Sequence, residues 1–336
     1  MKILFIGGTG LISSACSELV LERGHEIFIL NRSQSHKHPL PVGAQLIKGD
    51  VHGNQSDLSN LLQKYDFDSV VDWIAYTAED IERDIALFRG KTRQFVFISS
   101  ASAYEKPPTN YLITEETPLS NPFWQYSRDK IACETRLMDE YRNTGFLVTI
   151  IRPSLTYGPS QIPLNVGSWQ YPYTIIDRIK RGKKLIIPGD GTSLWVLTWN
   201  RDFATGLIGL FGNDQALGQA FHITSDEVLS WNQIYHEVFS AIGLQPVIVH
   251  IPSDLIAAYC PEAVGSLIGD KINSVVFDNS KIKKFVPDFH CEVPWAEGVK
   301  RAIAWHEADP SRMIVDQDAN SLWDRIIASY EKVFPA

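Results

Sequence analysis

A short apolar segment that runs directly into a glycine-rich turn limits the fold of this chain more than any other feature. Residues 3–6 (Ile-Leu-Phe-Ile) are all apolar, which is typical of a strand buried on both faces of a parallel sheet. The turn, residues 7–13 (Gly-Gly-Thr-Gly-Leu-Ile-Ser), leads into an amphipathic segment over 11–22 that predicts a helix. Glycines between a strand and a helix allow a tight turn and let a pyrophosphate approach the helix N-terminus. The sequence therefore predicts a dinucleotide-binding unit here.

Strand-like and helical segments alternate through the first half of the chain. The further predicted strands are 26–30, 45–48, 66–73, 94–99 and 147–152, and a long helix is predicted over 125–143. This alternation indicates a parallel sheet with helices on both faces. We predict an α/β fold with a Rossmann doubly wound parallel sheet over 1–160. Beyond it, 161–336 is predicted to form a smaller mixed α/β substrate-binding region, with some segments returning to the first domain.

Composition and charge exclude several classes of protein. The 336 residues carry a formal net charge of −8, so nucleic acid is an unlikely main partner. The four cysteines are widely scattered and the histidines show no metal-ligand spacing, so we expect reduced thiols and no metal site. No apolar run reaches the roughly 18–20 residues of a membrane span. We therefore expect a cytoplasmic protein without a membrane partner.

The glycine turn and the ends of the next two strands supply candidate cofactor residues. The turn residues expected at the pyrophosphate are Gly7, Thr9, Gly10, Leu11 and Ile12. An acidic residue at the end of the second strand would bind the adenosine ribose of NAD, but this chain has Asn31 and Arg32. With no carboxylate to repel a 2′-phosphate, NADP is slightly favoured; alternatively, Arg32 stacks on the adenine and Asn31 holds the ribose of NAD. Asp50 and Val51 follow the third strand. They are either contacts of the adenine or part of a plain turn.

A serine, a tyrosine and a lysine form the candidate catalytic set. Tyr126 and Lys130 lie four residues apart near the start of the long predicted helix, so they share one face. A lysine ammonium beside a phenol lowers the phenol pKa from about 10 towards working pH, as general acid–base catalysis requires. Ser100 ends the fifth strand, where its hydroxyl can bond a carbonyl or hydroxyl undergoing hydride transfer. Ser99 and Ser102 are its neighbours.

These motifs together resemble the extended short-chain dehydrogenase/reductases, and within them the NAD-dependent epimerase/dehydratase family. Three segments carry the closer likeness: 95–104 around Ser100, 152–159 after the sixth strand, and 189–204. Of these, 95–104 is similar to the segment that carries the catalytic serine in UDP-galactose 4-epimerase-like members. A likeness to the chloroplast stem-loop-binding-protein-like branch rests on three other segments, 67–72, 94–96 and 248–250. The resemblance implies hydride transfer at a hydroxyl or carbonyl carbon of a nucleotide sugar or related carbohydrate, by an epimerase or a reductase. It also implies that Lys130 holds the nicotinamide ribose, and that the chain forms a homodimer. The further cofactor contacts it implies are Ile74, Ala75 and Pro153.

Three departures from the family pattern qualify that expectation. Ser13 replaces the third glycine of the turn and is expected to loosen or reshape it. Ala101 and Ser102 stand where dehydratases carry an acidic pair, so 4,6-dehydratase chemistry is disfavoured. Trp195 stands where sugar-nucleotide enzymes often have a diphosphate-binding arginine, which puts a nucleotide-sugar substrate in doubt. Basic residues over 178–184 either substitute for that arginine or form a solvated face.

The remaining candidates have both a functional and a packing interpretation. Tyr76, Ser102, Trp169 and Trp195 are predicted substrate contacts, and Tyr76 is a candidate gate of the pocket; the alternative is ordinary packing. Glu134 is expected at the surface or in a helix pair. A second class of function stays open, a non-catalytic dinucleotide-sensing or RNA-associated binding protein, because plant members of the stem-loop branch are associated with RNA. The intact Tyr126 and Lys130 argue for an enzyme.

Overall fold

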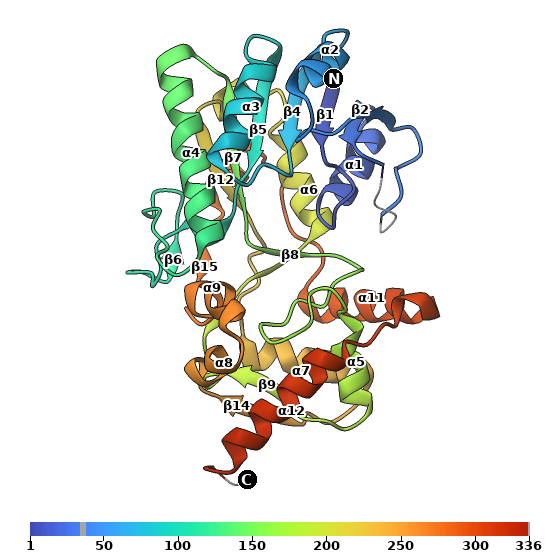
Figure 1. The fold of residues 1–336 in the computed structure, drawn as a ribbon, viewed down its shortest axis with the longest axis vertical. Helices are drawn as coiled ribbons and strands as arrows, with labels where there is room; N and C mark the ends of the chain where they lie inside the picture. The colour runs from blue at the N-terminus through green and yellow to red at the C-terminus, as the bar shows by residue number, and fades with distance from the viewer. Residues whose placement is uncertain (34–37, 335–336) are drawn as a thin grey trace.

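A parallel sheet of seven strands organises the upper half of the molecule (Figure 1). The computed structural model describes residues 1–33 and 38–334. The strands, in their order across the sheet, are β12 (Gln219–Ile223), β7 (Val148–Pro153), β5 (Thr92–Ile98), β4 (Phe67–Asp72), β1 (Lys2–Ile6), β2 (Glu26–Asn31) and β3 (Gln45–Lys48). The strand order reverses between β1 and β4, and ligands of such sheets bind outside the carboxyl ends of the strands at this point. The predicted Rossmann fold is therefore confirmed.

Helices cover both faces of the sheet because successive strand residues alternate between the faces. Ile3 and Phe5 pack in the cluster that includes α1 (Ser13–Glu22) and α6 (Asn200–Gly209). Leu4 packs in the opposite cluster. The helices on that second face are α2 (Gln55–Leu62), α3 (Ala78–Phe88) and α4 (Gln125–Thr144). The continuous apolar run of the first strand thus reflects burial on both sides.

Local signals fix the ends of the two helices beside the site. Thr77 and Asp80 form a capping box at the start of α3, in which each side chain accepts the backbone N–H of the other residue. The long helix α4 ends at Gly145, whose left-handed conformation (φ 74°) favours glycine. Each helix therefore begins or ends at a residue suited to its position.

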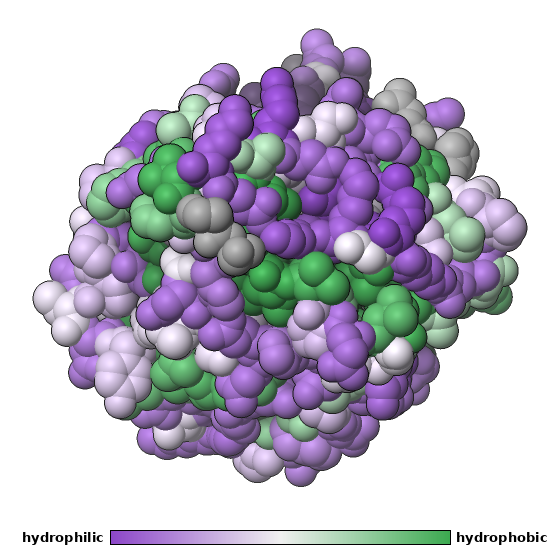
Figure 2. All heavy atoms as spheres, turned by 90° about the horizontal axis from the view of Figure 1, so that it is seen from below, coloured by the Kyte–Doolittle hydropathy of each residue, from purple (hydrophilic) through white to green (hydrophobic). Residues whose placement is uncertain are grey.

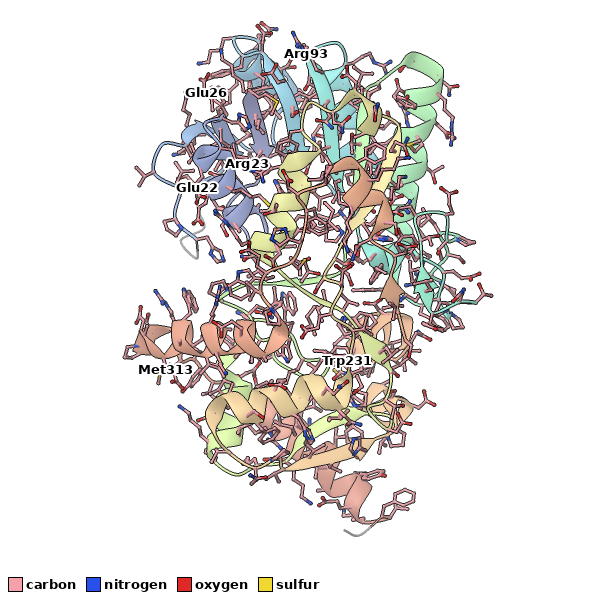
Figure 3. The ribbon with its side chains drawn as sticks, turned by 180° about the vertical axis from the view of Figure 1, so that it is seen from behind. Glu22, Arg23, Glu26, Arg93, Trp231 and Met313 are labelled. Atoms are coloured by element: carbon pink, nitrogen blue, oxygen red, sulfur yellow. The ribbon has the colours of Figure 1, made fainter. Side chains whose placement is uncertain are left out.

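A second lobe lies below the carboxyl edge of the sheet (Figure 1). Its helices are α5 (Tyr173–Lys180), α7 (Trp231–Ile242), α8 (Ser253–Tyr259), α11 (Trp295–Glu307) and α12 (Gln317–Glu331), with β9 (Leu185–Pro188) and β14 (Ile248–Ile251) paired in parallel. Trp231 lies in this lobe (Figure 3) and is 1% exposed. Two later stretches, α6 to β12 and α10 (Ser280–Phe285), pack back on the sheet. The second half of the chain thus contributes to both lobes.

The outer surface of the second lobe is mostly hydrophilic. Figure 2, seen from below, shows an apolar strip crossing this face among polar side chains. The exposed apolar residues near the C-terminus include Val333 and Phe334. Across residues 1–33 and 38–334, we find no helix with the length and apolar character needed to cross a membrane.

Candidate functional site

The turn after β1 depends on two glycines in a left-handed conformation. Gly7 and Gly8 have φ angles of 100° and 88°, in the left-handed region that glycine adopts without strain. A Cβ atom at Gly7 would lie 3.2 Å from Ile74 Cγ2, so a larger residue would crowd the turn. Ser13 Oγ accepts a 2.8 Å hydrogen bond from the Gly10 amide, and Ser13 is buried. Ser13, in the position of the third glycine, therefore stabilises the turn. The expectation of a looser turn does not agree with this hydrogen bond.

A cavity extends from the glycine turn to the ends of β2 and β3. It has a volume of about 350 Å³ and is lined by Asn31, Arg32, Asp50 and Val51, together with residues of the glycine turn. The Arg32 side chain is exposed, and Asn31 Oδ1 accepts the Ser33 amide at 2.8 Å. The predicted adenosine residues therefore share one cavity. Asp50 also accepts the His52 amide at 3.0 Å, so it closes a turn as well.

Lys130 is anchored to the backbone beneath the glycine turn. Its Nζ donates to the carbonyl oxygens of Ala75 (2.7 Å) and Ile98 (2.8 Å), and the residue is 2% exposed. Burial lowers the pKa of Lys130 to about 8. The Ala75 and Ile74 amides are in turn held by Asp72 Oδ1, at 2.7 and 2.6 Å. Asp72 thus fixes the loop after β4 on which the lysine rests.

Tyr126 and Ser100 meet in front of Lys130. The lysine Nζ lies 5.8 Å from the centre of the Tyr126 ring. Burial raises the pKa of Tyr126 to about 12, and the hydrogen bond with the Ser100 side chain partly opposes this rise. The expected lowering of the phenol pKa by Lys130 is absent from this geometry, because the ammonium is directed to backbone carbonyls. Tyr126 is therefore a protonated phenol at neutral pH in this structure.

A chain of hydroxyl groups extends from Ser100 to the start of α4. Ser100 Oγ lies 2.9 Å from Ser102 Oγ, which accepts a 2.8 Å hydrogen bond from Ser127 Oγ. Asn121 Nδ2 donates to the Ser102 carbonyl at 2.9 Å. Ser102 therefore supports Ser100, and it also lines the cavity of about 430 Å³ next to these residues.

A buried ion pair lies behind Ser100, the candidate catalytic serine. Arg152, on β7, and Glu134, on α4, are joined with Nη2 and Oε2 2.6 Å apart, and their side chains are 6% and 3% exposed. Ser99 Oγ donates to the same glutamate at 2.5 Å. The expectation that Glu134 lies at the surface or in a helix pair is therefore wrong. The glutamate instead ties the strand end that carries Ser100 to the helix that carries Tyr126.

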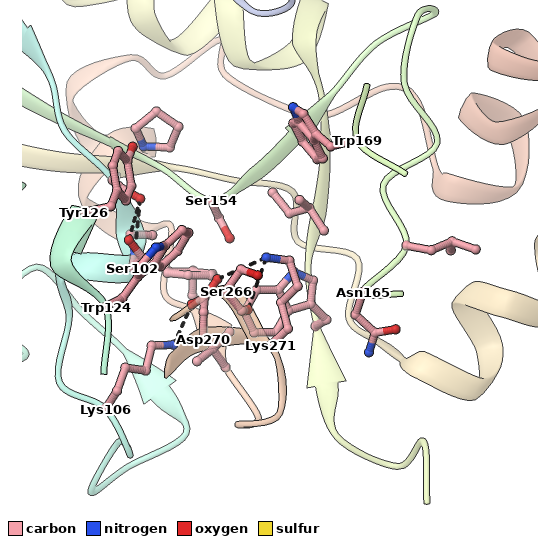
Figure 4. Close-up of a pocket in the computed structure, with 18 of the residues that line it drawn as sticks. Ser102, Lys106, Trp124, Tyr126, Ser154, Asn165, Trp169, Ser266, Asp270 and Lys271 are labelled. Atoms are coloured by element: carbon pink, nitrogen blue, oxygen red, sulfur yellow. Dashed lines mark hydrogen bonds and ion pairs between the residues drawn. The ribbon is translucent and has the colours of Figure 1, made fainter. Parts of the chain in front are cut away.

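A cavity next to the candidate catalytic residues has a volume of about 430 Å³. This cavity shares several lining residues with the groove that holds the glycine turn: Ser100, Tyr126, Pro153, Ser154 and Trp169. The two spaces therefore join at the candidate catalytic residues. Figure 4 shows three charged side chains on the floor of this cavity, which we name the floor cluster: Lys106, Asp270 and Lys271.

Nearly all the predicted site residues line this set of joined cavities. Tyr76, Ser102, Trp169 and Trp195 border them together with the catalytic set and the cofactor residues. Ala75 is the exception: it is fully buried and acts through its carbonyl on Lys130. The floor cluster was missed because Lys106 precedes two prolines and Asp270-Lys271 follows an apolar stretch, with no motif at either place. A metal site was not expected, and no group of three or more possible metal ligands occurs in the described residues.

Comparison with known proteins gives relatives of several activities. The chain is 27% identical over 270 residues to chloroplast stem-loop binding protein of 41 kDa b from Arabidopsis thaliana, covering 74% of this chain but only 65% of that protein. It is 25% identical to UDP-N-acetyl-alpha-D-glucosaminuronate decarboxylase from Bacillus cytotoxicus, covering 90% of this chain and 97% of the relative.

Solved structures and a family model agree on the fold. An epimerase from Methanothermobacter thermautotrophicus superposes with a TM-score of 0.75 at 18% identity, covering 93% of this chain and 94% of that one. The model of the NAD dependent epimerase/dehydratase family matches residues 3–223, which include the glycine turn, Ser100, Tyr126 and Lys130. The chain belongs to the NAD-dependent epimerase/dehydratase family.

Proposed function

We propose that this protein is an NAD(P)-dependent epimerase or reductase that transfers hydride at a hydroxyl or carbonyl carbon of a nucleotide sugar or related carbohydrate. The observation that carries the proposal is the meeting of Ser100, Tyr126 and Lys130 where the cofactor groove joins the 430 Å³ cavity. A substrate carbon in that cavity would lie between the serine and tyrosine hydroxyls and the groove. Membership of the family and the sugar-nucleotide activity of the Bacillus relative support the same proposal.

The residues present fit a dinucleotide, and each has a distinct task. The glycine turn would hold the pyrophosphate, and the β2 and β3 ends the adenosine. When bound, the nicotinamide supplies or accepts the hydride. Tyr126, protonated at neutral pH, gives its proton to the substrate oxygen during reduction and takes one back during oxidation. Ser100 orients that oxygen, and Lys130 holds the ribose side of the groove.

Dehydration is a weaker candidate than epimerisation or reduction. Ala101 and Ser102 follow the catalytic serine, and the Ser102 hydroxyl is engaged with Ser100 and Ser127. Among the described residues that line the 430 Å³ cavity, Asp270 is the one carboxylate, and two lysines lie beside it. Removal of water needs a free acid–base pair, which this set does not offer.

The form in which the protein is isolated tests the proposal and separates its two versions. We expect native mass spectrometry to find a bound or readily bound nicotinamide dinucleotide. Retention through dialysis would favour an epimerase, which regenerates its own cofactor, and reversible micromolar binding would favour a reductase. Failure to bind either NAD or NADP would contradict the proposal.

Cofactor preference gives a further prediction. Replacing Arg32 by alanine is expected to lower the affinity for NADP by about tenfold and the affinity for NAD by less. The reason is that the exposed guanidinium lies at the end of β2, where a 2′-phosphate would lie. Fluorescence titration of both cofactors measures the ratio. Equal losses would assign Arg32 to stacking on the adenine instead, and would remove the reason for favouring NADP.

RNA binding without turnover is the second candidate, favoured by the name of the Arabidopsis relative. The net charge of −8 argues against it. A stem-loop RNA that binds at low salt and dissociates as salt rises would support it, and a gel shift without any complex would exclude it. A homodimer and a cytoplasmic location stay predictions.

A further inference from the structure

The floor cluster carries more positive than negative charge in a mostly enclosed place. Lys106 Nζ lies 3.1 Å from one oxygen of Asp270, and Lys271 Nζ lies 3.7 Å from the other. The lysine side chains are 2% and 14% exposed, and the aspartate is 13% exposed. One carboxylate therefore faces two ammonium groups. Buried charge without a counter-charge is costly, so a ligand that brings negative charge would relieve this site.

Unused hydrogen-bond donors border the same cavity. Trp195 is 2% exposed, and its Nε1 has no partner among the described residues. Lys106 Nζ lies 5.6 Å from the centre of the Trp195 ring, so the indole stands beside the cluster. Asn165 Nδ2 is also buried without a partner, although its Oδ1 accepts the Tyr235 hydroxyl at 2.7 Å. Buried donors are normally paired, and those that are not call for an explanation such as an absent ligand.

The backbone that presents the cluster is itself unusual. Asp270 and Lys271 end η4 (Leu267–Lys271), a π-helix of five residues. Such wide helical turns are rare, and they occur frequently at functional sites. Burial lowers the pKa of Lys271; Asp270 opposes this effect, and repulsion by Lys106 adds to it. A bound anion would oppose the lowering further. Backbone geometry, unpaired donors and excess charge thus agree.

We infer that the floor cluster binds an anionic oxygen group of the substrate, a phosphate or a carboxylate, with Lys106 and Lys271 as the charged donors and Trp195 as a neutral one. This inference rests on the proposed function, because it assigns the substrate of that site. It also gives Trp195 a role, since lysines on other elements supply the positive charge that an arginine at its position would have provided. The substrate would thus be an acidic one, with its anion on the floor and its reacting carbon at Tyr126.

Binding to the cofactor-loaded protein tests this assignment without requiring turnover. The probes are UDP for a diphosphate and glucuronate for a carboxylate, with glucose as the neutral control, each measured by calorimetry. We expect Lys271→Met to lower the affinity for the anionic probe by about tenfold or more, because the variant loses a charge-assisted hydrogen bond. Asp270→Asn should tighten it several-fold, because the competing carboxylate is removed. Lys91 is exposed, so Lys91→Met serves as the control and should leave the affinities for both anionic probes unchanged.

Opposite signs for these two variants separate an electrostatic role from general damage to the fold. Loss for UDP alone would identify a diphosphate, and loss for glucuronate alone would identify a carboxylate of the sugar. If neither probe binds, or if binding is the same in all variants, the inference is wrong. NAD or NADP titration of the same variants before cofactor loading keeps the two proposals apart. Failure to bind cofactor contradicts the proposed function, whereas loss of only the lysine effect contradicts the anion site.

Discussion

Replacing Tyr126 by phenylalanine is expected to lower kcat by about 10²–10⁴-fold, the usual contribution of a positioned general acid or base. The variant removes one oxygen atom and keeps the ring, which lies 5.0 Å from that of Trp124 and 6.3 Å from that of Tyr76. Cofactor affinity should therefore change little. Stopped-flow absorbance of the reduced nicotinamide measures the hydride step, and titration measures the affinity.

A matched control distinguishes catalysis from the loss of any phenol. Tyr111 is 59% exposed and lies outside the joined cavities, so Tyr111→Phe should leave kcat unchanged. Equal turnover of Tyr126→Phe and wild type would contradict the catalytic assignment and favour a binding protein. A parallel fall in cofactor affinity would instead indicate that the phenol shapes the groove.

The parts of this fold that sequence could predict are those governed by local periodicity. The predicted bounds of β3, 45–48, coincide with the observed ones, and the predicted end of the long helix at 143 lies one residue before the end of α4, where Gly145 gives a clear stop. The glycine turn is equally local, since its strand, glycines and helix are consecutive.

The site could be predicted only where one short motif carries it. Tyr126 and Lys130 share a helix face, so their proximity follows from spacing alone. The floor cluster joins Lys106 to residues 270 and 271, more than 160 positions later, and single-sequence reasoning contains no register for such a contact. The orientation of Lys130 is a similar case, because its carbonyl partners on two other elements are set by the packing of α4 on the sheet.

Glu134 shows why charged residues on a helix mislead this kind of reasoning. A glutamate on a helix is normally expected to face solvent, and several other charged residues of α4 do face solvent. Here its carboxylate is held by Arg152, with contacts of 2.6 to 3.2 Å, and by Ser99. Removing one partner of such a pair leaves a buried charge without compensation. We therefore expect Glu134→Ala to lower the free energy of unfolding by about 3–5 kcal/mol, measured by urea denaturation.

Two comparisons make this expectation specific. Asp139→Ala, on the same helix, breaks an exposed pair with Arg142, and surface pairs of this kind contribute about 0–1 kcal/mol. A similar loss in both variants would contradict the role given to Glu134. The double replacement Glu134→Leu with Arg152→Met should recover most of the lost stability, because it removes both buried charges together. Its catalytic activity should nevertheless stay low, since Ser99 would lose its carboxylate partner and the strand end that positions Ser100 would no longer be tied to α4.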